Sequence, residues 1–198
     1  AFYAKEFIGS LKRGYFYWTN PYNAKKSLVS FSKARFIVFW SKNPAPIIPF
    51  LNELDNLGLG YYFNFTLNDY ENEGLEPNLP ELKKRIGLFR SLSEQVGRER
   101  IIWRFDPLIL LHGQKTDILI NKINSIAEQI YSHTNKLVFS FVDVNYRKVK
   151  NKIKKSGISI SELVPALKNE IAWKLSETGK KFGLEIASCA QSDDFSIF

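Results

Sequence analysis

Residues 101–107 read IIWRFDP, and this stretch decides how the rest of the chain is interpreted. Its first five residues are apolar except for Arg104, and the run is too short for a buried helix. Asp106 and Pro107 then end the run with a polar residue and a chain-turning residue. We therefore predict a buried strand over residues 101–105 whose end carries charged side chains.

Four more apolar runs of similar length lie on either side of this stretch. They cover residues 36–40, 61–67, 137–142 and 184–187. The segments between them place apolar residues at helical spacing, which predicts parallel strands joined by helical crossovers. Every strand ends in a polar cluster, as at the mouth of a β/α barrel, so we expect an α/β fold with an incomplete TIM-like barrel, as a single domain over residues 1–198. An open doubly wound sheet shares the same alternation and is the alternative.

A helix and a β-hairpin are predicted ahead of the first of these strands. Residues 3–13 place apolar side chains on one side at helical spacing, and Gly14 ends the helix. The runs 15–18 and 27–31 are rich in aromatic and β-branched residues, and they flank the turn sequence NPYN at residues 20–23. This arrangement predicts a hairpin with a loop of moderate length.

An acidic loop, residues 68–76, follows the strand at 61–67. It leads to a predicted helix for which Asn78 is the expected N-cap, because asparagine is favoured there and Pro80 suits the first turn.

The composition is that of an ordinary globular domain, with 44% hydrophobic and 24% charged residues. No apolar run approaches the roughly 20 residues needed to cross a bilayer. Charged residues from Lys5 to Arg13 interrupt the first apolar stretch, so a signal peptide is not expected. Cys189 is the single cysteine, which excludes an internal disulfide and a multi-cysteine metal site within this sequence. We expect a cytoplasmic protein without a membrane partner.

The net charge of +8 is distributed unevenly. Residues 1–50 hold eight Lys/Arg against one acid, Glu6, and a second basic run covers residues 147–155. Such patches can attract phosphate or nucleic acid. Solvated helix faces are the more ordinary interpretation of the same residues.

Three charged residues at strand ends are the catalytic candidates: Arg104, Asp106 and Asp143. Strand alternation puts Arg104 and Asp106 on one face. An arginine within an apolar strand needs a partner when it is buried. That partner is either Asp106 or Asp143, or a carboxylate or phosphate of a ligand.

Four polar residues at other strand ends are candidates for substrate binding. They are Lys42, Asn43, Asn64 and Thr66. Lys42 could neutralise an anionic group, or it could be an exposed lysine with Asn43 capping the next helix. Asn64 and Thr66 share the face that points into the predicted barrel, where they need partners from a ligand or from neighbouring strands.

Several kinds of site are not indicated. His112 and His133 are the only imidazole bases, and neither is expected to have a catalytic serine or cysteine partner, so a hydrolytic triad is not expected. The sequence also has no phosphate-binding glycine-rich loop and no zinc-ligand spacing.

Four motifs, in chain order, resemble a bacterial family, the domain of unknown function 1848. They are FWSKNP at 39–44, YFNFT at 62–66, WRFDP at 103–107 and FSFVD at 139–143. The resemblance covers nearly the whole chain and implies a barrel. It also implies a distant similarity to radical-type iron–sulfur enzymes such as spore photoproduct lyase, whose cluster would be held by cysteines outside these residues.

The leading functional hypothesis is therefore the barrel of a radical-type iron–sulfur enzyme, with no cofactor bound within this segment and the seven candidate residues at its mouth. One alternative is a nucleic-acid-binding module that uses the basic runs and exposed Tyr and Trp. Another is a metal-free barrel that acts on a small phosphorylated or carboxylated compound.

Overall fold

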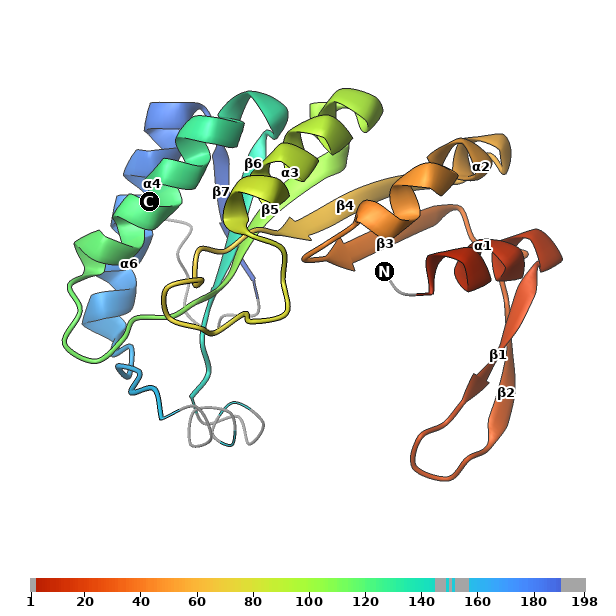
Figure 1. The fold of residues 1–198 in the computed structure, drawn as a ribbon, viewed down its shortest axis with the longest axis horizontal. Coiled ribbons are helices and arrows are strands. Elements are labelled where there is room, and N and C mark those ends of the chain that lie inside the picture. Colours follow the sequence, from red (N-terminus) through yellow and green to blue (C-terminus); the bar gives the residue numbers. More distant parts are fainter. Residues whose placement is uncertain (1–2, 145–148, 150, 152–156, 190–198) are drawn as a thin grey trace.

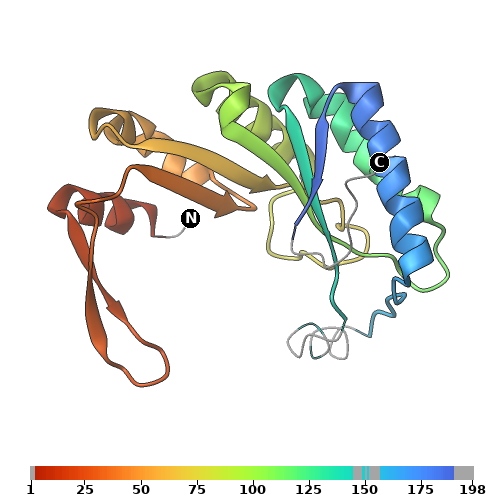
Figure 2. The same cartoon turned by 180° about the vertical axis from the view of Figure 1, so that it is seen from behind.

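The computed structural model describes residues 3–144, 149, 151 and 157–189. It begins with helix α1 (Ala4–Arg13), which Gly14 ends in a left-handed conformation by donating its backbone N–H to the carbonyl of Leu11. The hairpin strands β1 (Tyr15–Thr19) and β2 (Lys26–Ser30) follow and pair antiparallel. The predicted helix and hairpin are thus confirmed. Figures 1 and 2 show the hairpin projecting away from the rest of the molecule.

The five remaining strands form one parallel sheet. They are β3 (Phe36–Ser41), β4 (Gly60–Thr66), β5 (Ile101–Leu108), β6 (Lys136–Phe141) and β7 (Glu185–Ser188). Their spatial order is β3-β4-β5-β6-β7, and each neighbouring pair is parallel. All five strands predicted from the sequence are confirmed, as is their parallel arrangement. Within the described part of the chain, β3 and β7 are open edges, so the sheet is not closed into a barrel.

Helices connect successive strands. They are η1 (Ala45–Phe50), α2 (Leu51–Asn56), α3 (Leu82–Val96), η2 (Arg98–Arg100), α4 (Thr116–Ile130), η3 (Tyr131–His133) and α6 (Pro165–Phe182). The strand order never reverses, and right-handed crossovers between sequential parallel strands place the connecting helices on the same face. Figure 2 shows that none of the described helices covers the other face of the sheet. The doubly wound alternative requires helices on both faces around a switch point, which this order lacks.

The main core lies between the sheet and the helices. Phe63 and Phe65 of β4, Trp103 of β5 and Phe139 of β6 point toward the helices and are almost completely buried. Phe89 of α3 packs against Phe65, with ring centroids 5.2 Å apart. The strands are therefore apolar on this face because the helices cover it.

The opposite face of the sheet is partly open. Phe36, Val38 and Trp40 alternate along the edge strand β3, and 49–59% of each is exposed. The register places Trp40 beside Asn64 of β4 on this same face. This is the face that the sequence predicted to line a barrel interior, and its polar residues lie toward the carboxyl ends of the strands.

One detail of the sequence interpretation needs revision. Asn78 does not cap the helix after the acidic loop: α3 begins at Leu82, whose backbone N–H donates to Glu71 instead. The reason is that the loop continues past Asn78 and is fixed by its own carboxylates. Of the basic run 147–155, only residues 149 and 151 are described, so the interpretation of this run as a solvated helix face lies outside the described residues. None of the described helices is long and apolar enough to span a membrane.

Candidate substrate cleft

Arg104 and Asp106, both on β5, form an ion pair at the carboxyl end of the sheet. The Nε and Nη2 atoms of Arg104 donate to the same oxygen, Oδ2 of Asp106, at 3.1 and 2.8 Å. The hydroxyl of Ser140 on β6 donates to the other oxygen, Oδ1. Alternation along an extended strand brings residues i and i+2 to one face, which is why this pair forms. Asp106 is thus a partner of Arg104 within the chain.

A tryptophan covers the guanidinium of Arg104. The guanidinium carbon lies 4.1 Å from the ring centroid of Trp40, a cation–π distance. The indole Nε1 of Trp40 donates to Thr66 Oγ1 at 3.3 Å, which fixes the ring. Burial lowers the pKa of Arg104, but its contacts with Cys189 and Asp106 outweigh this effect, and the pKa is raised. Arg104 therefore stays charged although it is only 5% exposed.

Asn68, just after β4, holds the backbone of Asp106. Its Oδ1 accepts a hydrogen bond from the N–H of Asp106 at 2.9 Å, and its Nδ2 donates to the carbonyl of Asp106 at 3.0 Å. The same Nδ2 lies 3.2 Å from Oε1 of Glu76. This completely buried amide links the strand end to the acidic loop, and the sequence analysis did not single it out.

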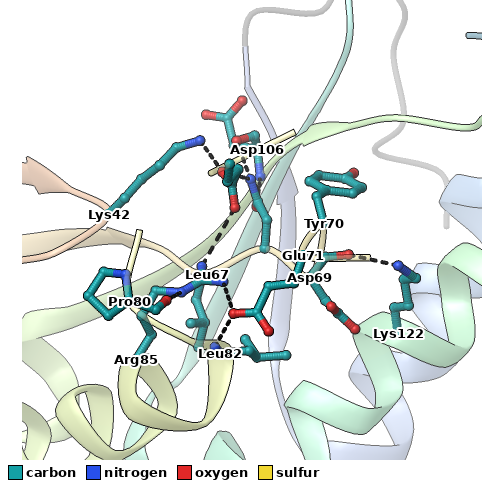
Figure 3. A network of polar contacts seen from close by, with 12 residues as sticks. Lys42, Leu67, Asp69, Tyr70, Glu71, Pro80, Leu82, Arg85, Asp106 and Lys122 are labelled. Carbon is teal, nitrogen blue, oxygen red and sulfur yellow. Dashed lines mark hydrogen bonds and ion pairs between the residues drawn. The ribbon is translucent and has the colours of Figure 1, made fainter. Parts of the chain in front are cut away.

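Glu76 is the centre of a second polar group. Its carboxylate accepts a hydrogen bond from Lys42 Nζ, and its Oε2 lies 3.6 Å from Nη1 of Arg85 on α3. The side chain of Glu76 is 6% exposed, whereas that of Lys42 is 41% exposed. Figure 3 shows Lys42 reaching into this network from the end of β3 and Arg85 approaching from the helix side. Lys42 is therefore a partly exposed lysine whose ammonium group is held in place by a buried carboxylate.

The rest of the acidic loop is tied to the helices. Lys122 of α4 contacts Glu73 Oε1 at 2.6 Å and donates to the backbone carbonyl of Asp69 at 2.9 Å. The buried Arg85 donates from Nε to the carbonyl of Pro80 at 2.8 Å. Figure 3 shows Arg85 and Lys122 on opposite sides of the loop. Charge pairing thus helps to fix the loop, together with Tyr70, whose ring is buried in the core beside Phe105.

A cleft of about 700 Å³ opens beside this network. The loop segment 74–79 forms one wall, and Pro107, Ile109, Val142 and Ile160 contribute apolar surface. Its polar lining includes Lys42, Asn68, Tyr70 and Glu76. Few polar groups in a mostly apolar cleft, over the carboxyl ends of parallel strands, are typical of a small-molecule site.

The remaining candidates have different surroundings. Asn43 Oδ1 accepts a hydrogen bond from the N–H of Ala45 at 3.2 Å, so it supports the turn that begins η1, whose N-cap is Pro44. Asn64 is buried on the open face of the sheet, beside Trp40. Asp143 is exposed just beyond the end of β6.

The described residues do not fit an iron–sulfur cluster or another bound metal. No three of their His, Cys, Asp and Glu side chains come together as a possible metal site. The loop carboxylates are instead occupied by Lys42, Arg85 and Lys122. A single thiol, Cys189, cannot supply the three or four thiolates that a cluster requires.

The chain belongs to the family described as domain of unknown function (DUF1848), whose match covers residues 1–198. The resemblance found in the four motifs is thereby confirmed. A search of curated proteins finds no match.

Proposed function

We propose that the protein is an enzyme that binds a small anionic substrate in the cleft at the carboxyl edge of an incomplete β/α barrel. The observation that carries this proposal is the position of Lys42, whose ammonium group is held by the buried Glu76 at a mostly apolar cleft. The one-sided helix arrangement supports a barrel over a doubly wound sheet.

The polar lining suits a substrate with one anionic group on an apolar body. An ammonium group has three donors, and Glu76 accepts one of them. A carboxylate or phosphate of the substrate would bind Lys42 from the open side, and the apolar wall of the cleft would cover the remaining surface. Asn64 and Thr66 would contact a substrate that extends onto the open face of the sheet, and Asn43 would shape the turn after Lys42.

Asp106 and Asp143 are the carboxylates that we propose for proton transfer. Arg104 would act as a positioning residue, because its two hydrogen bonds fix the orientation of Asp106. Asn68 would fix the backbone of the same residue. A carboxylate held from two sides is oriented for chemistry on a substrate beside it.

A radical-type iron–sulfur reaction is the finer form of this proposal, and it is supported by the resemblance of the motifs alone. Because the described residues do not fit a cluster, its ligands would have to be cysteines outside this sequence. Anaerobic reconstitution of residues 1–198, followed by iron and sulfide assays, should therefore yield no stoichiometric cluster. A stoichiometric cluster on these residues would contradict the assignment of ligands to other parts of the protein.

The substrate site can be tested with small carboxylates and phosphates, screened by thermal shift and measured by calorimetry. Lys42→Met should weaken binding of any hit by about 10- to 100-fold, the effect of losing a charged hydrogen bond. Lys136→Met is the matched control, because Lys136 also pairs with a glutamate but lies at the amino end of β6. If both variants bind the hit as the parent does, the ligand is not in this cleft.

A further inference from the structure

The hairpin β1–β2, which we call the arm, presents almost its entire surface to solvent. Every residue of β1 except Phe16 is exposed, and so is every residue of β2. Figures 1 and 2 show the arm extending from the end of α1, away from the sheet and the cleft. A two-stranded hairpin without a covering layer is marginally stable by itself, so the retention of large side chains on its surface calls for an explanation.

Two tyrosines share one face of the arm, and Trp18 is exposed on the other. Tyr15 and Tyr17 alternate along β1 and therefore share a face, with ring centroids 5.8 Å apart in an edge-to-face arrangement. Tyr17 is 64% exposed, and Tyr22 at the tip is 97% exposed. Leu28 lies opposite Tyr17 in the register and adds apolar surface.

The arm and its two flanks are also strongly basic. Residues 12–35 contain six Lys/Arg and no Asp or Glu. Lys12 pairs with Glu53 outside this stretch, at 2.6 Å. The register places Lys26 opposite Thr19, on the same face as Tyr15 and Tyr17, and Lys25 precedes it at the tip. Cations and aromatic rings thus share one surface.

We propose that the arm binds single-stranded nucleic acid, with bases stacked on Tyr15, Tyr17 and Tyr22 and phosphates bound by Lys25 and Lys26. Stacking platforms combined with a positive surface are the usual means of sequence-tolerant single-strand binding. An acidic peptide would match the charge but would leave the aromatic rings without stacking partners. The proposal is independent of the substrate cleft, which lies at the carboxyl ends of β3 to β6.

The base of the arm allows this surface to be altered without unfolding the molecule. Phe16, on the opposite face, stacks on Phe31 with centroids 5.4 Å apart, and Phe31 contacts Phe7 of α1 at 6.3 Å. These contacts attach the arm to α1 through the face opposite Tyr17. Substitutions of Tyr17, Lys25 and Lys26 should therefore leave the melting temperature of the domain unchanged.

The test is fluorescence anisotropy of the protein with labelled 12-nucleotide dT and U strands, between 50 and 300 mM salt. Tyr17→Ala should weaken binding at least about fivefold, as expected for losing one stacked base. Lys25→Gln/Lys26→Gln should lower the slope of log K against log salt by about 1.4, since each phosphate contact contributes about 0.7. The DNA and RNA strands show whether the 2′-hydroxyl contributes.

Matched control variants lie on α6, away from the arm. Trp173→Ala removes another exposed aromatic ring, and Lys180→Gln/Lys181→Gln removes two other lysines, so both should bind as the parent does. Absence of binding by the parent, or equal losses in arm and control variants, would overturn the proposal. Tighter arm-dependent binding to duplex DNA, to poly-glutamate or to anionic vesicles of phosphatidylserine would overturn it in favour of that partner.

Discussion

Arg104 and Asp106 lie two residues apart on β5, and Arg104 donates two hydrogen bonds to one carboxylate oxygen of Asp106. The other oxygen accepts from Ser140, so the carboxylate connects β5 with β6. Trp40 of β3 covers the guanidinium from a third strand. A single buried charge thus joins three strands at the edge where the candidate cleft opens.

Arg104→Ala should destabilise the domain by about 3 kcal/mol, toward the lower end of the usual cost of breaking a buried ion pair. The lower end applies because Asp106 keeps some contact with water after the arginine is lost, its side chain being 19% exposed. Urea unfolding of the two proteins measures this difference.

Arg35→Ala is the control for this prediction, since Arg35 is an exposed arginine whose side chain bonds to the neighbouring carbonyl of Ala34, so its loss should cost less than about 0.5 kcal/mol. The unfolding should be repeated with phosphate and with sulfate. If Arg104→Ala is as stable as the parent but loses stabilisation by these anions, Arg104 binds a ligand rather than Asp106.

Asn68→Ala should cost about 2–3 kcal/mol, because it leaves buried backbone groups of Asp106 without partners. Asn68→Asp should cost more at pH 7, since a carboxylate oxygen would then face the carbonyl of Asp106 and the carboxylate of Glu76. Chemical denaturation at pH 7 measures both variants.

Asn72→Asp makes the same substitution at an exposed position of the same loop and should be nearly neutral. A finding that Asn68→Asp is no worse than Asn68→Ala would mean that the amide is oriented the other way, with its oxygen toward Glu76.

The strands and their parallel order could be predicted because each strand is an uninterrupted apolar run between amphipathic helices. The partner of Arg104 was among the predicted alternatives, because alternation along a strand fixes which residues share a face. These features depend on local periodicity, and periodicity is visible in a single sequence.

Asn68 and Glu76 were not predicted, because the loop that carries them has no periodicity. Their roles depend on contacts with Lys42 and Asp106, which are distant in the sequence. The same loop explains why Asn78 was wrongly assigned as a helix cap: Glu71 reaches the N–H of Leu82 and moves the helix start. Barrel closure could not be decided either, since it depends on what pairs with β3 and β7.

Lys122→Met should destabilise the domain by about 3 kcal/mol, because it leaves the carboxylate of Glu73 in a site where that side chain is 11% exposed. Adding Glu73→Gln should restore much of the loss, since the double variant has no unpaired charge. Urea unfolding of the two single variants and the double variant gives the coupling between the residues.

The exposed pair Lys180–Glu177 provides the comparison, and Lys180→Met should cost less than about 0.5 kcal/mol. If the changes in unfolding free energy caused by Lys122→Met and Glu73→Gln simply add in the double variant, the two residues are not coupled. That result would contradict the assignment of this ion pair as a contact that fixes the loop.

Asp69→Asn should stabilise the domain at neutral pH and have little effect at pH 3. Burial raises the pKa of Asp69 above its usual value, with the neighbouring Glu73 adding to the rise and Lys122 opposing it. Between the unfolded pKa and the raised folded pKa, the folded state binds more protons than the unfolded state, so stability falls as the pH rises through this interval. Below the unfolded pKa both states are protonated, and the carboxyl group carries no penalty.

The opposite sign is expected for Asp117→Asn, which makes the same chemical change on α4. A hydrogen bond from Lys174 and the charge of that lysine lower the pKa of Asp117, so its contribution to stability is present at neutral pH and is lost as the pH falls. Urea midpoints of the parent and both variants at pH 3, 5 and 7 should therefore diverge in opposite directions as the pH rises. If the urea midpoints of the two variants, relative to the parent, change with pH in the same direction, burial of Asp69 does not raise its pKa. The acidic loop would then be better solvated than its contacts indicate.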